Sequence, residues 1–217
     1  LGRDGDTPAK ETLHFPGGLR DYLSARLEDR AVITGVPFVG DAGFNNGKTG
    51  RVEWAITWPD DGEGGLTSYC NTVPTPQGGT HEAGLRTALT RGLKAYGKLV
   101  GNRRAKAITA DDVVAGAWGI LSLFIPDPEF QGQTKERLAT TGAARLVEIS
   151  IKDHFDHYLS ADTYMAGALL ERIIERAEDR LRRRHEKEFA RKTPTRRTRL
   201  PGKLTDCSQG AAAGTEI

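Results

Sequence analysis

The run Ala117–Ile125 narrows the folds open to this chain more than any other feature. It is apolar over almost its whole length and is as long as one strand. A continuous apolar run of this length predicts a strand buried on both faces, and therefore central in a sheet. Pro126 and Pro128 follow at once, and because proline cannot donate to a strand ladder, we expect the strand to end there.

The stretch before this run predicts two further strands. Arg51–Trp58 alternates, with apolar side chains at every second position from Val52, which is typical of a half-buried strand. Asp60–Gly65 has the composition of a turn, and Leu66–Val73 again has that of a strand. Because a short connection suffices for antiparallel neighbours, we expect these two strands to pair.

Apolar residues at helical spacing alternate with these strands along the chain. We expect helices after Gly17-Gly18, over His81–Leu99, from Thr109, over Ala143–Leu159 and over Asp162–Arg191, short strands at Thr12–Phe15 and Val36–Val39, and a loop with an Asn46-Gly47 turn at Gly40–Gly50. The longest helix carries one apolar stripe, formed by Met165, Leu169, Ile173, Ala177 and Leu181. This mixture of elements predicts an α+β fold.

The positive charge of the chain is concentrated near its end. The net formal charge is +2, whereas Glu171–Arg199 holds twelve basic and six acidic residues. An arginine-rich helix face can bind DNA phosphates, but interleaved acids are equally typical of a solvated face. Both interpretations stay open for Arg182–Arg184.

Cysteine use and hydropathy predict a cytoplasmic protein. Cys70 and Cys207 lie far apart, without CxxC spacing or a disulfide framework, which fits a reducing compartment. The chain has no apolar signal core, and no run approaches the roughly 18 apolar residues that a membrane span requires. We therefore expect a cytoplasmic location and no membrane contact.

The segment Pro126–Leu138 turns through two prolines and Gly132 and presents Gln133 and Lys135 before a helical pattern resumes. A lysine in this position can meet a phosphate as a point charge, with helix-start N–H groups alongside. Considered alone, a lysine in a polar turn is more often simply solvated.

Two other polar groups could suggest chemistry, and a structural role is favoured for each. His81 lies beside Glu82 at the start of a predicted helix that we expect Thr80 to cap, which favours a structural over a catalytic histidine. The second group consists of Asp153, His154, Asp156 and His157. These residues could bind zinc, but no further ligands follow at a recognisable spacing, so a solvated helix face is favoured.

Four segments, in order along the chain, resemble blocks of the B subunits of bacterial type IIA topoisomerases, the family of DNA gyrase and topoisomerase IV. The segment around Lys135 is similar to their Gln-Thr-Lys loop, and the segment Pro74–Leu89 to their Gly-Gly-Thr-His block. Phe15–Leu23 resembles the entry into their transducer domain, and Leu200–Cys207 resembles the start of their metal-binding TOPRIM domain. Four blocks in the family's order are more specific than any single one, and their details lean toward topoisomerase IV.

The resemblance implies a cofactor-binding site. In the family, the lysine of this loop reaches the terminal phosphate of ATP in the neighbouring ATPase domain and the glutamine assists, so these roles fall on Lys135 and Gln133. The chain has no GxxxxGK[ST] loop. The resemblance implies that the family's nucleotide-binding motifs precede Leu1 and that its magnesium ligands follow Ile217. No catalytic residue and no metal ligand is therefore expected within this chain.

The resemblance also implies the domain organisation. The α+β fold would be a transducer domain, a ribosomal-protein-like domain 2 fold with a left-handed βαβ crossover, which periodicity would not predict because roughly 98% of crossovers are right-handed. Residues 1–15 would end a GHKL ATPase domain, residues 16–192 would form the transducer domain with a long C-terminal helix, and residues 193–217 would hold a linker and the start of the TOPRIM domain.

The implied function is part of an ATP-dependent type II DNA topoisomerase that changes DNA topology by double-strand passage. This segment would couple ATP binding and hydrolysis to gate motion, and alone it should neither hydrolyse ATP nor relax DNA. The implied partners are DNA, the topoisomerase A subunit in an A2B2 heterotetramer, and a second copy of the ATPase-bearing chain through the ATPase domain. Two alternatives stay open: the transducer domain of another GHKL ATPase, and a non-enzymatic basic module that binds nucleic acid through Arg172–Arg199.

Overall fold

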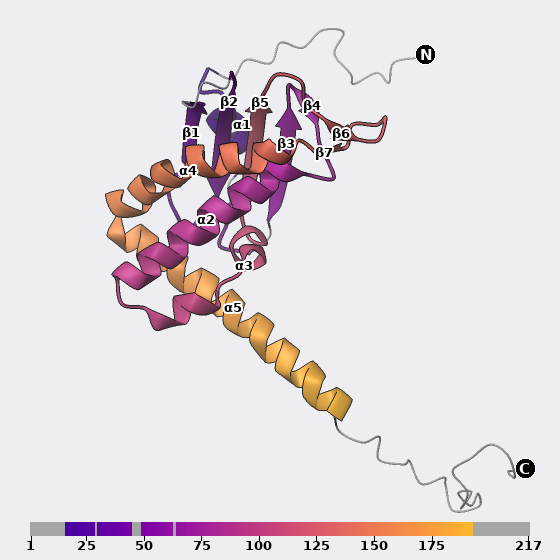
Figure 1. Cartoon of the computed structure of the whole chain (residues 1–217). Coiled ribbons are helices and arrows are strands. Elements are labelled where there is room, and N and C mark those ends of the chain that lie inside the picture. Colours follow the sequence, from indigo (N-terminus) through magenta and orange to yellow (C-terminus); the bar gives the residue numbers. More distant parts are fainter. Residues whose placement is uncertain (1–15, 29, 45–48, 63, 193–217) are drawn as a thin grey trace, which may run out of the picture. The chain divides into compact units, whose positions relative to one another are not determined.

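The computed structural model describes residues 16–28, 30–44, 49–62 and 64–192 (Figure 1). The chain divides into two units, Leu1–Glu178 and Asp179–Ile217. The first unit contains the sheet and the hydrophobic core. The described part of the second unit is the end of one helix, α5 (Thr163–Lys192). The predicted strand at Thr12–Phe15, the Asn46-Gly47 turn and the segment 193–217 lie outside the described residues.

The first unit is built on a five-stranded sheet with the order β1-β2-β5-β3-β4. The central strand is β5, which confirms the position predicted from its apolar run. It pairs antiparallel with β2 on one side and parallel with β3 on the other. The strands are β1 (Phe38–Gly43), β2 (Arg51–Thr57), β3 (Gly65–Cys70), β4 (Val73–Pro74) and β5 (Trp118–Phe124).

The expected pairing of the second and third strands is wrong, because β5 lies between them. Leu121 on β5 is opposite Trp54 of β2 and also opposite Ser68 of β3. A strand with two apolar faces buries most apolar surface in the centre of a sheet. The connection between β2 and β3 is long enough to cross over one intervening strand. The expected loop at Gly40–Gly50 is also too long, since β1 continues to Gly43.

Helices cover both faces of the sheet. On one face, Leu23 and Leu27 of α1 (Leu19–Leu27) pack with Ala55 and Ile120. On the other face lie α2 (Thr80–Leu99) and α4 (Thr141–Ala161), side by side (Figure 1). Strand β2 is consequently buried on both sides at its end and is not half-buried as expected.

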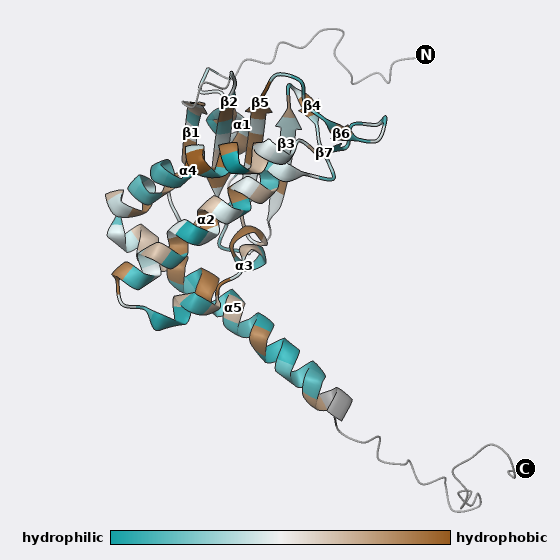
Figure 2. Cartoon of the chain, in the orientation of Figure 1, coloured by the Kyte–Doolittle hydropathy of each residue, from teal (hydrophilic) through white to brown (hydrophobic). Residues whose placement is uncertain are grey.

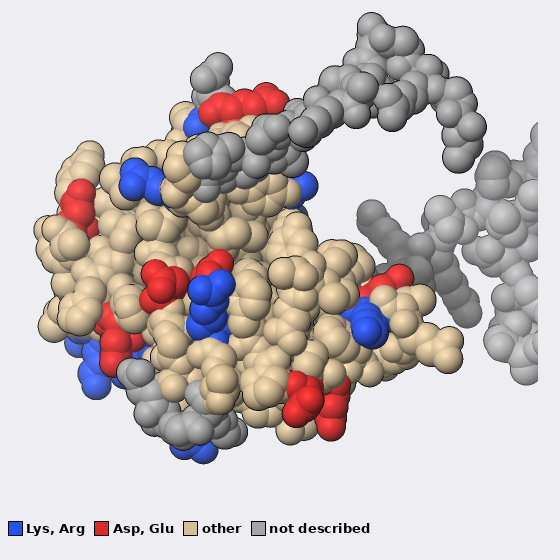
Figure 3. Space-filling view, turned by 90° about the horizontal axis from the view of Figure 1, so that it is seen from above, with Lys and Arg blue, Asp and Glu red and all other residues tan. Residues whose placement is uncertain are grey.

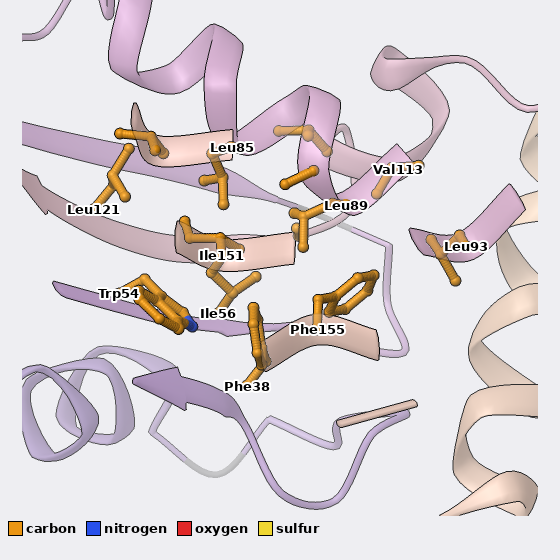
Figure 4. Packing of buried hydrophobic residues seen from close by; sticks show 14 of the residues in the cluster. Phe38, Trp54, Ile56, Leu85, Leu89, Leu93, Val113, Leu121, Ile151 and Phe155 are labelled. Atoms are coloured by element: carbon orange, nitrogen blue, oxygen red, sulfur yellow. The ribbon is translucent and has the colours of Figure 1, made fainter. Parts of the chain in front are cut away.

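The main core lies between the sheet and the α2–α4 layer (Figure 4). The ring of Phe38 contacts the rings of Trp54 and Phe155, with centroids 5.5 Å and 5.0 Å apart. Four of the five stripe residues predicted for the last helix are buried, and only Leu181 is partly exposed. Beyond them, hydrophilic residues dominate the end of α5 (Figure 2).

Two short elements connect α2 to β5, namely the 3-10 helix η1 (Arg103–Ala107) and α3 (Ala110–Val114). The predicted start at Thr109 is confirmed. Asp112 accepts hydrogen bonds from the backbone N–H and the hydroxyl of Thr109, at 2.7 Å and 2.8 Å. Aspartate therefore fills the capping-box position that glutamate or glutamine usually occupies.

None of the described helices combines the length and the apolar character that a membrane span needs.

The close crossing of α2 and α4 depends on Gly84. A Cβ there would overlap the carbonyl oxygen of Ala144 and lie 3.0 Å from the Cβ of Val147. Because a backbone atom cannot move aside as a flexible side chain can, we expect Gly84→Ala to lower the free energy of unfolding by about 1–3 kcal/mol.

The matched control is Gly167→Ala in α5, where an added Cβ meets nothing within 4 Å. That change should raise the free energy of unfolding by about 0.5–1 kcal/mol, because alanine restricts the unfolded chain. Urea denaturation of the wild type, Gly84→Ala and Gly167→Ala measures both changes in the free energy of unfolding. Equal effects of the two substitutions would contradict the importance of this crossing.

Candidate functional site

Gln133 and Lys135 lie on a hairpin that the sequence patterns did not predict. Its strands are β6 (Phe130–Gln131) and β7 (Arg137–Leu138), and both candidate side chains are exposed in the loop between them. Gly132 and Lys135 have positive φ angles of 76° and 56°, which bend the loop sharply. We call residues 130–138 the lysine hairpin.

The expected helix-start N–H groups are not beside Lys135, because α4 begins only at Thr141, after β7. The ammonium of Lys135 lies 5.9 Å from the centroid of the Phe130 ring in the same hairpin. Within the described residues, no carboxylate is within ion-pair distance of this ammonium. Lys135 is therefore an exposed cation that is available to an anion outside the segment.

The base of the lysine hairpin is attached to the segment Gln77–Gly79. Leu138 is buried, and its N–H donates to the carbonyl of Gly78 at 3.0 Å. The N–H of Gln77 donates to the carbonyl of Glu136 at 3.0 Å, and the two side chains of this pair are also hydrogen bonded. Gly79 forms a parallel bridge with Leu138. Two of the four family-like blocks thus meet at the hairpin base.

A chain of buried polar groups lies directly behind this attachment. The Oγ of Ser68 donates to the carboxylate of Glu82 at 2.6 Å, so it accepts from the hydroxyl of Thr75 at 2.7 Å. The Oγ1 of Thr75 then accepts from Nε2 of His81 at 3.1 Å. Since each hydroxyl has one proton, the bonds run in one direction from His81 to the Glu82 carboxylate.

This arrangement supports a structural role for His81. The side chain is fully buried, and its Nδ1 has no hydrogen-bond partner among the described residues. Burial lowers the pKa of His81 to about 4, from an ordinary value of 6.5. The ring is therefore neutral near pH 7, with its proton on the nitrogen that faces Thr75.

Thr80 is not the helix cap that the sequence predicted. It is the first residue of α2, and Gly79 precedes the helix. The hydroxyl of Thr80 instead donates to the carbonyl of Thr140 at 2.8 Å, where the chain leaves the lysine hairpin for α4. The residue at the cap position is a glycine with a φ of 144°, so no side chain caps the helix there.

The histidine-rich face of α4 does not assemble into a metal centre. Among the described residues, no three His, Cys, Asp or Glu side chains are grouped closely enough to hold an ion. One ring nitrogen of His154 lies 2.9 Å from the carbonyl of Ser150, and the ring makes an edge contact with Trp54.

Basic side chains gather at two places in the described part of the chain. A hollow of about 540 Å³ at the end of α2 and in η1 includes Lys94, Lys98, Arg103 and Lys106 among its lining residues, and no acid. On α5, the acids Asp179 and Glu188 pair with Arg182 and Arg184 at 2.9 Å and 3.2 Å. On the face seen in Figure 3, basic side chains instead lie singly among acidic ones.

Comparison with known proteins gives one consistent result. The family model described as DNA gyrase B matches residues 18–189. The B subunit of DNA topoisomerase 4 from Caulobacter vibrioides is 54% identical over 215 residues, which cover 97% of this chain and 31% of that protein. The chain thus spans about a third of the length of the curated relatives it matches.

Two solved structures show the same similarity. The topoisomerase IV ATP-binding domain of Francisella tularensis is 30% identical with a TM-score of 0.66, and the match covers 78% of this chain and 45% of that chain. The 43K ATPase domain of Thermus thermophilus gyrase B is 25% identical with a TM-score of 0.68, over 80% and 46% of the two chains.

The buried histidine makes stability depend on pH. Because the pKa of His81 is lower in the folded state, the unfolded chain binds a proton more readily between pH 6.5 and pH 4. The stabilisation is complete above pH 6.5 and is lost as the pH falls toward 4. Over this pH range we expect the free energy of unfolding of the wild type to fall by up to about 3 kcal/mol. His81→Gln should not show this fall.

Urea denaturation of both proteins at pH 7 and pH 4 measures this difference. Equal pH dependence of the wild type and His81→Gln would contradict the assignment of His81 as buried and neutral.

Proposed function

The chain belongs to the DNA gyrase B family, and on that premise we propose that it is the energy-coupling segment of the ATPase subunit of a type IIA DNA topoisomerase. Residues 16–192 would form the transducer domain with its long C-terminal helix. Parallel pairing of β3 and β5, joined by a connection that contains α2, supports a βαβ crossover, which in this fold would be left-handed. Residues 1–15 would end the GHKL ATPase domain, and residues 193–217 would lead into the TOPRIM domain.

The observation that carries the proposal is the exposed pair Gln133 and Lys135 at the tip of a hairpin whose base is attached to the core. A cation that contacts only the terminal phosphate of ATP loses its partner when that phosphate leaves. The contact therefore distinguishes ATP from ADP, and such differential contact is what shifts an equilibrium between two conformations.

The residues present fit one end of the nucleotide only. Lys135 and the amide of Gln133 can hold phosphate oxygens. No group of acids in the described residues could hold magnesium. The rest of the ATP site and the metal ligands would belong to other parts of the full-length chain. When bound, ATP supplies the phosphoryl group, and Lys135 would stabilise the negative charge on its terminal oxygens.

The proposed partners follow from the family. The full-length chain would dimerise through its ATPase domain, join the A subunit in an A2B2 heterotetramer and act on DNA in the cytoplasm. In this assembly, the segment would transmit the nucleotide state toward the DNA gate. By itself the segment would neither hydrolyse ATP nor relax DNA.

Nucleic-acid binding is the second candidate function. The sequence indicates Arg172–Arg199 for it, whereas in the structure the hollow at the end of α2 favours a different basic surface. The neighbouring Arg104 is neutralised by Glu171 and Glu178, with its nearest contact to Glu178 at 2.7 Å. The basic residues that line the hollow have no acid among them. In the full enzyme, this surface would contribute non-specific phosphate contacts and would not determine sequence specificity.

Removing the Lys135 charge tests the main proposal. In the full-length chain assembled with the A subunit, Lys135→Ala should lower ATP turnover and strand passage by about 10–100-fold, because a charge-assisted hydrogen bond contributes about 1.5–3 kcal/mol. Gln133→Ala should have a smaller effect in the same direction. Steady-state ATPase and DNA relaxation assays measure both.

Lys152→Ala on α4 is the matched control, since Lys152 is also an exposed lysine and pairs with its neighbour Asp153 at 3.8 Å. It should leave both activities within about twofold of the wild type, because surface ion pairs contribute little. Wild-type activity of Lys135→Ala would refute the proposed role of the hairpin.

Charge reversal at the hollow tests DNA contact. The triple change Lys94→Glu, Lys98→Glu and Lys106→Glu in the assembled enzyme should weaken DNA binding. It should also reduce the slope of log affinity against log salt by about 0.9 for each phosphate that is no longer neutralised. Lys152→Glu is the control, and an Arg182→Glu, Arg183→Glu, Arg184→Glu variant tests the end of α5. Unchanged slopes in both triple variants would exclude DNA contact at these surfaces.

A further inference from the structure

The attachment of the lysine hairpin leaves no room for a side chain at Gly79. A Cβ at this position would overlap the carbonyl oxygen of Leu138 and lie 2.6 Å from its nitrogen. These are backbone atoms of β7, so a side chain at Gly79 would push the hairpin away. The backbone of β7 can bond to the Gln77–Gly79 segment only because position 79 is glycine.

The hairpin has few other means of holding its orientation. Its two strands contain two residues each, and a two-stranded hairpin is marginally stable by itself. Leu138 is its one fully buried side chain, whereas Gln133 and Lys135 are exposed. The direction in which the tip points is therefore determined largely at its base.

The Gln77–Gly79 segment is in turn held by the core. The N–H of Gly78 donates to the carbonyl of Thr75 at 2.8 Å, and the N–H of Thr75 donates to the carbonyl of Ser68 on β3 at 2.8 Å. The polar chain through His81 and Glu82 fixes the first turn of α2 to the same strand. A continuous set of hydrogen bonds thus joins β7, β3 and the start of α2.

We propose that Gln77–Gly79 is a clasp that positions Lys135 for the nucleotide and passes the state of that contact to β3 and α2, with Gly79 and Gln77 as positioning residues. This inference rests on the proposed function, because it presumes that Lys135 contacts the terminal phosphate. Movement at the hairpin tip would reach the central sheet through backbone hydrogen bonds, which do not depend on flexible side chains.

A double-mutant cycle in the full-length chain, assembled with the A subunit, tests the clasp. The measured quantity is the affinity for a non-hydrolysable ATP analogue divided by the affinity for ADP. Gly79→Ala should lower this ratio by about fivefold or more, since contacting or coupled residues interact by 0.5–3 kcal/mol. In a Lys135→Ala background, Gly79→Ala should cause no further loss, because the positioned group is already absent.

Gly101→Ala is the matched control, at the other end of α2. Its φ is also positive, at 74°, and an added Cβ meets nothing within 4 Å. It also places an alanine at a positive φ, without touching the hairpin, so the affinity ratio should stay at the wild-type value. Gln77→Ala, which removes only the exposed side-chain bond to Glu136, should lower the ratio about twofold. It is the decisive variant if Gly79→Ala does not fold.

The possible outcomes separate the two proposals. If Lys135→Ala lowers the ratio but neither Gly79→Ala nor Gln77→Ala does, the clasp is wrong and the proposed function stands. If the clasp variants lower the ratio equally with and without Lys135, they act through general loss of structure and the clasp is also wrong. If Lys135→Ala leaves the ratio unchanged, the phosphate contact itself is refuted.

Discussion

The burial of β5 on both faces is the constraint on which the rest of this structure depends. Its side chains pack against α1 on one face and against the α2–α4 layer on the other. It pairs with β2 and β3, which are therefore held apart in the sheet. The segment that leaves β5 passes through Pro126 into the lysine hairpin, so a strand buried on both faces lies directly before a hairpin with one fully buried side chain.

Sequence patterns predicted what local chemistry determines. The apolar run of β5, the stripe of α5 and the cap at Thr109 each depend on residues within one element, and the structure has all three. The pairing of β2 with β3 was mispredicted because partner choice depends on a strand that follows much later in the chain. The hairpin was missed because strands of two residues have no periodicity to detect.

The residues of the candidate site also divide into those that the sequence indicated and those that only the folded structure shows. Lys135 was indicated by resemblance, since a polar turn with one lysine has no physical signal that separates it from a solvated loop. The bond between Gln77 and Glu136 joins residues 59 positions apart, and neither residue type predicts the other. A glycine pair such as Gly78-Gly79 is typical of a close backbone approach, but its partner β7 is visible only in the folded chain.

The left-handed backbone of Lys135 has a consequence for how this position can change. A φ of 56° costs a non-glycine residue about 1–3 kcal/mol, and glycine or asparagine would relieve that strain. Neither would carry the positive charge. Relieving the backbone strain at position 135 with either residue therefore also removes the proposed sensor, so selection for stability and selection for activity act in opposite directions on this residue. A chain of this family optimised for thermal stability alone would be expected to lose this lysine.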